Sequence, residues 1–278
     1  MIGFGARLHA AMASRGPLCA GIDPHPALLS AWGLSSDVDG LERFSRTVVD
    51  ALAGQVAVLK PQSAFFECYG SRGIAVLERV IADARSAGAL VIADVKRGDI
   101  GSTAAAYAQA YLDPSSPLFC DAMTASPYLG VGALAPLVDT ALANGAGVFV
   151  LALTSNVEGR TVQHARTEDG RTVAQTVLDE LAALNAGADP LGSIGAVVGA
   201  TIGATGHDLS AVNGPFLAPG IGAQGATAAD LRTVFGSALS AVLPSTSREV
   251  LRHGPDPVAL RAAADRALAA CQSVLTTV

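Results

Sequence analysis

Eight short apolar runs recur along the chain, and longer segments of mixed polarity separate them. Most of these runs are continuously apolar, which is typical of parallel β-strands that are buried on both faces. The candidate strands are residues 18–23, 55–60, 89–96, 118–125, 147–154, 194–200, 216–219 and 237–244.

The segments between the candidate strands carry apolar residues at helical spacing. The stripes are Ile74, Leu77, Ile81 and Ala84, then Val173, Val177, Leu181 and Leu184, then Leu260, Ala264, Leu268, Cys271 and Leu275. The last of these helices has Asp256 as a candidate N-cap and Pro257 in its first turn. A short leading helix is predicted from the spacing of Phe4, Leu8 and Met12.

This alternation of strands and helices predicts a parallel sheet with right-handed crossovers. The chain has no evident linker or repeat, and its 278 residues suit a barrel of about 250 residues. We therefore predict an α/β fold, a (β/α)8 TIM barrel, with residues 1–278 as a single domain. A doubly wound open sheet is the alternative. Residues 155–172 are the least regular piece and predict a long loop after the fifth strand.

Composition narrows the class of protein. Half of the residues are hydrophobic and 15% are charged, which is ample for a large core, and the net charge of -6 disfavours a nucleic-acid partner. No apolar run is long enough to span a membrane, and the amino terminus lacks the apolar core of a secretory signal. The four cysteines are scattered without a Cys-x-x-Cys pair, so we predict buried free thiols in a cytoplasmic protein.

Lysine is used only twice, at Lys60 and Lys96, among 18 basic residues. An ammonium group can sit at a reacting carbon and release a proton, which a guanidinium group cannot do. Two lysines kept in an arginine-rich chain are therefore candidates for chemistry.

Charged residues gather at the predicted ends of the first three strands. Asp23 follows the first strand, Lys60 ends the second, and Asp94, Lys96 and Asp99 lie at or beyond the end of the third. Because side chains alternate along a strand, Asp94 and Lys96 are expected to point the same way, towards the barrel mouth. A plain buried ion pair is the alternative for Asp94 and Lys96, and a turn residue the alternative for Asp23.

A glycine-rich segment, Pro219 to Gly225, follows the seventh strand and formally contains G-x-G-x-x-G. A dinucleotide site requires an acidic residue at the end of the next strand, which here ends in Pro244-Ser245-Thr246, so that function is excluded. Loops after strands seven and eight of a barrel commonly bind phosphate, and Arg248 would add a forked cation. A glycine-rich turn with a surface arginine is the alternative.

Other polar residues give weaker signals. The histidines at 25, 164, 207 and 253 have no metal spacing, so we predict ordinary surface residues and no metal site. Ser155 and Asn156, after the fifth strand, could contact a ligand or close a turn.

The run from Asp94 to Thr103, Asp-Val-Lys-Arg-Gly-Asp-Ile-Gly-Ser-Thr, resembles the signature of orotidine 5′-phosphate decarboxylases. The resemblance extends over nearly the whole chain: Gly-Ile-Asp at 21–23, Leu-Lys-Pro at 59–61, the segment 219–225 and Arg248 also resemble this family, in its bacterial branch.

The resemblance implies decarboxylation of orotidine 5′-monophosphate to uridine 5′-monophosphate without a cofactor. Its catalytic residues would be Lys60, Asp94, Lys96 and Asp99, and the substrate-binding residues would be Asp23, Ile100, Thr103, Ser155, Pro219, Gln224 and Arg248. It also implies a homodimer in which Asp99 reaches into the active site of the partner subunit, with Ile100 and Thr103 crossing the interface beside it.

Loss of carbon dioxide from the pyrimidine leaves a poorly delocalised carbanion at ring carbon six. Lys96 could stabilise this charge and then donate the proton that ends the reaction. Two other functions remain open: a magnesium-dependent sugar-phosphate enzyme that shares Asp-x-Lys-x-x-Asp, and a non-catalytic sensor of phosphate ligands. The second-strand lysine argues against the first, and two buried ammonium groups argue against the second.

Overall fold

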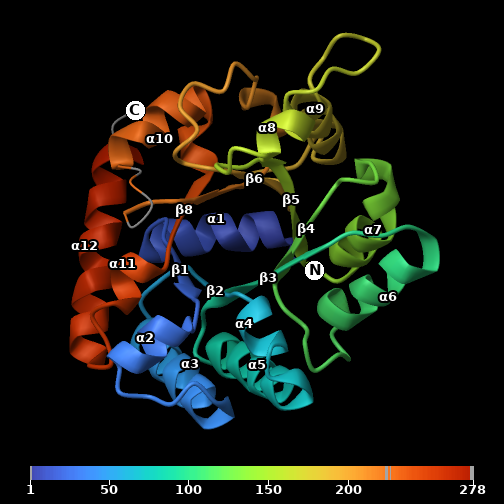
Figure 1. Cartoon of the computed structure of the whole chain (residues 1–278). Coiled ribbons are helices and arrows are strands. Elements are labelled where there is room, and N and C mark those ends of the chain that lie inside the picture. Colours follow the sequence, from blue (N-terminus) through green and yellow to red (C-terminus); the bar gives the residue numbers. More distant parts are fainter. Residues whose placement is uncertain (1, 223–224, 226, 276–278) are drawn as a thin grey trace.

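The computed structural model describes all residues except 1, 223–224, 226 and 276–278. Eight parallel strands pair in sequence order and close into a barrel (Figure 1), so the prediction of a (β/α)8 barrel is confirmed and the open sheet is wrong. The strands are β1 (Cys19–Ile22), β2 (Val58–Pro61), β3 (Leu90–Arg97), β4 (Ala122–Ala125), β5 (Gly147–Leu153), β6 (Ile194–Val198), β7 (Phe216–Pro219) and β8 (Val242–Thr246).

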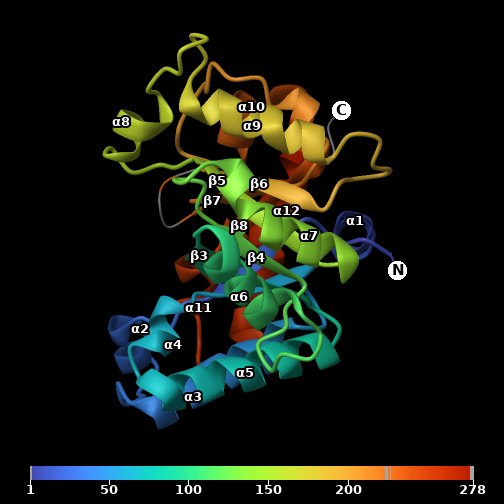
Figure 2. The ribbon, with the colours of Figure 1, turned by 90° about the vertical axis from the view of Figure 1, so that its right-hand side faces the viewer.

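Helices surround the barrel, as the view turned by 90° also shows (Figure 2). The larger ones are α1 (Phe4–Arg15), α3 (Val38–Leu52), α5 (Gly70–Ser86), α6 (Gly101–Leu112), α7 (Ala135–Ala143), α9 (Val173–Leu184), α10 (Ala228–Phe235) and α12 (Pro257–Leu275). Shorter turns of helix are α2 (Pro26–Ala31), α4 (Ala64–Glu67), α8 (Gly159–Gln163), α11 (Arg248–Leu251) and the 3-10 segments η1 (Val131–Leu134), η2 (Ser210–Val212) and η3 (Gly236–Ala241). No helix within the described residues is long and apolar enough to cross a membrane.

The leading helix α1 closes the amino-terminal end of the barrel. Phe4 and Leu8 are fully buried in a cluster with the inward-facing residues of the strands, and Phe4 packs edge-on against Phe149 of β5 at 5.8 Å. Arg7 ties the helix to the buried carboxylate of Asp121, just before β4, at 2.6 Å. A ligand therefore has access only from the carboxyl ends of the strands.

Several sequence predictions of detail are confirmed or corrected. The N-cap of α12 is confirmed, because Asp256 accepts the N–H of Val258 at 3.0 Å. The predicted strand 237–244 is wrong in its first half, since Gly236 turns the chain at a φ of 49° and η3 follows. The predicted loop at 155–172 contains α8. Three cysteines are buried and free as predicted, whereas Cys68 is exposed.

Candidate active site

The ends of β2 and β3 bring three charged side chains into contact. Lys60 Nζ donates to Asp94 Oδ2 at 2.8 Å, and Lys96 Nζ donates to Asp94 Oδ1 at 2.5 Å. The side chains of Lys60 and Asp94 are 7% and 10% exposed, whereas that of Lys96 is 46% exposed. We call these three residues the charged cluster. They are three of the residues that the sequence predicted to converge at the barrel mouth.

Burial and charge act in opposite directions on this cluster. Burial favours the neutral carboxyl at Asp94, but the two ammonium groups outweigh it and lower the pKa of Asp94 well below its usual range. At Lys60, burial favours the neutral amine, but the charges of Asp94 and then Asp23 outweigh it and raise the pKa. Asp94 is therefore ionised and Lys60 protonated throughout the physiological pH range.

A β-bulge near the end of β3 sets the orientation of Lys96. Ala93 pairs with Met123 and Arg97 pairs with Ala125, so four steps along β3 match two along β4, and β3 carries two extra residues. Within the bulge Lys96 has a left-handed backbone, with a φ of 45°. Asp94 and Lys96 do meet, as expected, but the strand between Ala93 and Arg97 is bulged and does not have the regular alternation from which that expectation was derived.

Thr124 of β4 is a polar residue of the site that the strand-end pattern did not identify. Its side chain is buried, and its hydroxyl donates to Asp94 Oδ1 at 2.9 Å. The same hydroxyl oxygen accepts the backbone N–H groups of Val95 at 3.0 Å and Lys96 at 2.9 Å. The available signal was a lone hydroxyl residue in the apolar strand Ala122–Ala125.

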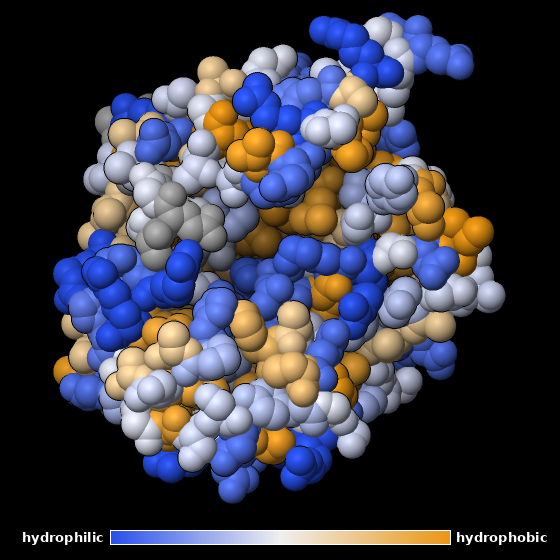
Figure 3. All heavy atoms as spheres, in the orientation of Figure 1, coloured by the Kyte–Doolittle hydropathy of each residue, from blue (hydrophilic) through white to orange (hydrophobic). Residues whose placement is uncertain are grey.

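A pocket of about 360 Å³ opens beside the charged cluster, at the carboxyl ends of β1, β2, β3, β7 and β8. It is lined by Asp23, His25, Lys60, Gln62, Asp94, Pro219, Gly220, Ile221, Ser245, Thr246, Ser247 and Arg248. The space-filling view shows this end of the barrel hollowed and edged by hydrophilic side chains (Figure 3). The predicted phosphate residues Pro219 and Arg248 thus lie in one pocket with part of the charged cluster, whereas Gln224 lies outside the described residues.

Asp23 follows β1 and faces this pocket. Its Oδ1 atom is buried and has no hydrogen-bond partner among the described residues. Buried acceptors are nearly always paired, so a donor is missing at this oxygen. Gly21 allows the approach of Ser247, because a Cβ at this glycine would lie 1.9 Å from the Ser247 hydroxyl.

His25 lines the same pocket. Its ring is half-buried and packs against Phe65, with centroids 4.2 Å apart. The prediction of an ordinary surface residue is therefore wrong for His25.

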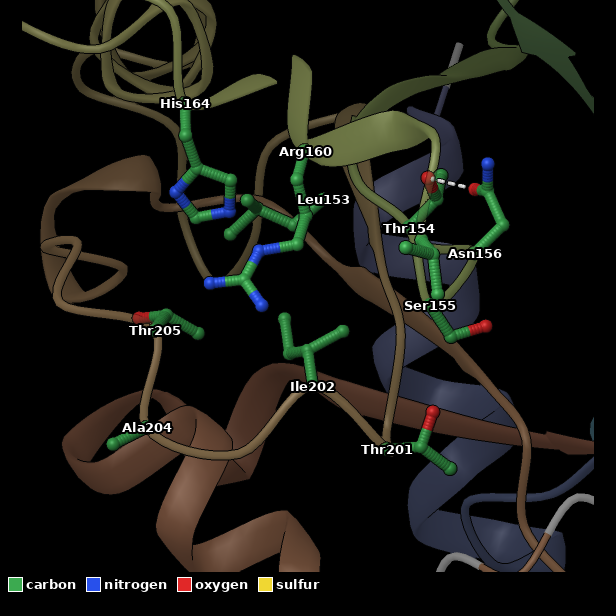
Figure 4. A pocket seen from close by; sticks show the side chains of 11 residues that line it. Leu153, Thr154, Ser155, Asn156, Arg160, His164, Thr201, Ile202, Ala204 and Thr205 are labelled. Atoms are coloured by element: carbon green, nitrogen blue, oxygen red, sulfur yellow. Dashed lines mark hydrogen bonds between the residues drawn. The ribbon is translucent and has the colours of Figure 1, made fainter. Parts of the chain in front are cut away.

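Ser155 lies in a second pocket, of about 270 Å³, at the carboxyl ends of β5 and β6. The lining residues are Leu153, Thr154, Ser155, Asn156, Val157, Arg160, His164, Thr201, Ile202, Ala204 and Thr205. Figure 4 shows the guanidinium of Arg160, from α8, directed into this pocket between His164 and Ile202. Ser155 is thus not among the residues that line the first pocket.

His207 fastens the two loops that form this second pocket. Its ring nitrogens lie 2.8 Å from the Thr172 hydroxyl and 2.6 Å from the carbonyl oxygen of Thr205. Burial and the neighbouring His164 ring, at 5.7 Å, lower the pKa of His207 despite the bond to Thr205. The prediction of an ordinary surface residue is thus wrong for His207, which is half-buried and bonded through both ring nitrogens.

The segment after β3 contains three predicted residues, and two of them, Ile100 and Thr103, are exposed. Asp99 accepts the N–H of Ile100 at 2.8 Å, and the Ile100 side chain is 61% exposed. Thr103 is exposed on α6. Across the described ranges Asp99 forms no ion pair, so the structure does not place it in the charged cluster of its own chain.

The residues described contain no group of three or more His, Cys, Asp or Glu side chains that could hold a metal ion. The site instead combines two ammonium groups, a carboxylate and a pocket with an arginine at its edge. Placed at the carboxyl ends of barrel strands, this arrangement defines a (β/α)8-barrel enzyme with an anion-binding active site.

The chain belongs to the orotidine 5′-phosphate decarboxylase / HUMPS family, which matches residues 16–263. It is 72% identical over 276 residues to an orotidine 5′-phosphate decarboxylase of Salinispora arenicola, covering 99% of both chains. It is 67% identical over 264 residues to that of Streptomyces coelicolor, covering 95% of both.

Solved structures agree with this assignment. A crystal structure of a Streptomyces avermitilis protein assigned as an orotidine 5′-phosphate decarboxylase has a TM-score of 0.97 and 64% identity, covering 100% of this chain and 97% of that one. The orotidine 5′-monophosphate decarboxylase of Leishmania donovani has a TM-score of 0.78 and 29% identity, with both chains fully covered.

Proposed function

We propose that this protein is a carboxy-lyase that converts orotidine 5′-monophosphate into uridine 5′-monophosphate and carbon dioxide, the last step of pyrimidine nucleotide synthesis. The observation that carries the proposal is the charged cluster beside a pocket that contains Asp23 and Arg248. Relatives above 65% identity over nearly their whole length bear the same activity in their names.

Lys96 is the group that acts on the reacting carbon. The bond between ring carbon six and the carboxylate breaks, carbon dioxide leaves, and the electron pair remains on carbon six. The ammonium of Lys96 stabilises this charge and donates its Nζ proton to the carbon, after which solvent reprotonates the amine. Its 46% exposure supports this role, because Lys96 is the most exposed member of the charged cluster.

Lys60 and Asp94 prepare the site for this step. Asp94 contacts both ammonium groups, so it holds Lys96 in place while Lys60 balances the remaining charge. A fixed arrangement of charges aimed at the developing carbanion needs no reorganisation during the reaction, which is the main source of electrostatic catalysis.

Substrate binding is divided between the two pockets. Arg248 and the backbone after Pro219 bind the phosphate, while the unpaired Oδ1 of Asp23, together with Lys60, binds the ribose hydroxyls. Ser155 approaches the pyrimidine from the second pocket. Phosphate binding far from the reacting carbon contributes energy that orients the base.

The active protein is a homodimer that shares residues between its two sites. Asp99 enters the partner subunit's active site, and Ile100 and Thr103 lie in the interface. The Ile100 side chain is 61% exposed, so it is free to enter such an interface. Residues 1–278 act as one domain, and the free buried thiols of Cys19, Cys120 and Cys271 suit the cytoplasm.

The experiment that tests the proposal follows the loss of orotidine 5′-monophosphate absorbance in the ultraviolet. The wild-type protein should turn the substrate over in excess EDTA, whereas the Lys96→Ala variant should lose turnover by at least about 10⁴-fold and still bind uridine 5′-monophosphate. Arg79→Ala, which removes an exposed cation paired with Glu42 on another face, should behave as wild type.

Two results would reject the assignment. Near-normal turnover by Lys96→Ala would remove the proton donor from the mechanism. A strict requirement for a divalent metal would instead favour the sugar-phosphate chemistry that shares the Asp-x-Lys-x-x-Asp pattern.

A further inference from the structure

We propose that Thr124 is the positioning residue of the active site: its hydroxyl holds the bulge of β3 and thereby sets where Lys96 and Asp94 meet the substrate. The proposal rests on the proposed function for the roles of the two charged residues. It adds a residue of β4 that does not itself touch the substrate.

The bulge leaves two backbone N–H groups of β3 without a hydrogen-bond partner in the sheet. Because two residues of β3 have no counterpart on β4, the N–H groups of Val95 and Lys96 are displaced from the regular ladder. Val95 is buried, so water does not supply the missing partner there. Both N–H groups instead converge on one side-chain oxygen, that of Thr124, at 3.0 and 2.9 Å.

Every hydrogen-bonding position of the Thr124 hydroxyl is used. A hydroxyl has two acceptor lone pairs and one donor proton. Since the two backbone groups can only donate, they occupy both lone pairs, and the hydroxyl proton must point to Asp94 Oδ1, 2.9 Å away. The direction of the bond to the carboxylate is thereby fixed by the backbone of β3.

This network holds Lys96 in a backbone conformation that it would not adopt by itself. A φ of 45° lies in the left-handed region, which is unfavourable for a residue with a Cβ. The Lys96 amide bonded to Thr124 and the Lys96 ammonium bonded to Asp94 Oδ1 fix both ends of the residue. Thr124 contacts that same Oδ1 atom, so one hydroxyl positions the carboxylate and the lysine together.

A purely structural role would require only a side chain of this shape. Valine has nearly the same volume as threonine and would fill the same space in β4, but it cannot form the three hydrogen bonds. Serine keeps the hydroxyl and loses only a methyl group. Comparing the valine and serine variants therefore separates the role of the hydroxyl from the role of packing.

The test compares Thr124→Val and Thr124→Ser in the full-length protein with orotidine 5′-monophosphate as substrate. Thr124→Val should lower kcat by about 100-fold, the effect of misplacing a reacting group by about 1 Å, with KM changed less than about threefold. Thr124→Ser should recover kcat to within about fivefold of wild type. Ser45→Ala, which removes a buried hydroxyl on α3 that has no partner among the described residues, is the matched control and should keep full activity.

Amide hydrogen exchange provides a second measurement that does not depend on activity. The Val95 and Lys96 amides should be protected in wild type and in Thr124→Ser, and should exchange at least about tenfold faster in Thr124→Val. If the valine variant does not fold, Thr124→Ala against Thr124→Ser gives the same comparison without added bulk.

The outcomes separate the two proposals. An inactive wild-type protein would overturn the proposed function, while the exchange rates would still decide whether Thr124 holds the bulge. An active wild type with unchanged kcat in Thr124→Val, or equal losses in the valine and serine variants, would overturn the role of the hydroxyl.

Discussion

Replacing Asp94 by asparagine would show how much the buried charge at the centre of the site contributes to stability. Asparagine has the same shape as aspartate and can still accept a hydrogen bond from Thr124. It leaves both ammonium groups beside an uncharged side chain, and the Lys60 side chain is only 7% exposed. The variant therefore keeps the packing and removes the charge that compensates Lys60.

The expected cost follows from this burial. Removing one partner of a buried ion pair costs about 3–5 kcal/mol, because the other charge is left without compensation. For a domain of this size, about 1 kcal/mol corresponds to a shift in Tm of about 2–4 °C, so the Tm should fall by roughly 6–20 °C. Turnover should fall as well, since Lys96 loses the carboxylate that holds it.

Thermal unfolding followed by circular dichroism measures this cost, with Asp169→Asn as the matched control. Asp169 pairs with Arg171 at 2.6 Å, and this exposed arginine lowers the pKa of Asp169 as the lysines do for Asp94. Exposed pairs contribute little to stability, so the control should melt like wild type. A variant at position 94 that melts within about 2 °C of the Asp169 control would refute the reasoning.

The contributions of Asp94 and Lys60 to stability depend on pH in opposite directions. Because the pKa of Asp94 is lowered in the folded state, its contribution is complete above its ordinary value of 3.8 and is lost as pH falls below it. The raised pKa of Lys60 makes its contribution complete below 10.5 and lost at more alkaline pH. In Asp94→Asn, burial of Lys60 favours the neutral amine, so the deficit in Tm should shrink between pH 7 and pH 10.

Two further substitutions test substrate binding and assembly. Arg248→Ala should raise KM at least about tenfold, because a charge-assisted contact to phosphate contributes about 1.5–3 kcal/mol; steady-state kinetics measures it, and an unchanged KM would exclude a phosphate contact. Ile100→Glu should turn dimers into monomers in light scattering and lower turnover together with the loss of dimer, because Asp99 would no longer reach the partner subunit; a fully active monomer would contradict a shared site.

The positions of the charged residues could be predicted because they depend on local patterns. Continuous apolar runs give the strands, and a barrel places its functional residues where these runs end. Lys60 and Asp94 stand at such ends and do meet, at 2.8 Å. Arg248 was expected just past the eighth strand and lies there, although part of the run before it forms η3.

The details that could not be predicted depend on neighbours in space. The left-handed backbone of Lys96 results from the register between β3 and β4, which no segment of β3 specifies alone. Thr124 acquires its role from that register, and in the sequence it is one hydroxyl within an apolar strand. Likewise the bonds of His207 to Thr172 and Thr205 join loops whose proximity no local pattern indicated.

The layering of the barrel interior explains why the interactions within the charged cluster are not weakened by water. Two residues before Lys60, Asp94 and Thr124, the inward side chains are Val58, Ile92 and Ala122, all fully buried. Since side chains repeat their direction every second residue of a strand, an apolar layer lies directly beneath the polar one. Below it α1 closes the barrel, so water reaches the cluster only from the mouth.

A charged group in such surroundings interacts with other charges more strongly than it would in water. Burying the charged residues therefore costs free energy on folding, but the site then stabilises developing charge more strongly. The compensation comes from pairing: each carboxylate oxygen of Asp94 has an ammonium partner, and Oδ1 also has the Thr124 hydroxyl. A bound substrate that covers the mouth removes the remaining water at Lys96, whose side chain is the exposed member of the cluster. The buried Lys60 and Asp94 thus hold the exposed ammonium of Lys96 at the barrel mouth, where the proposed reaction requires it.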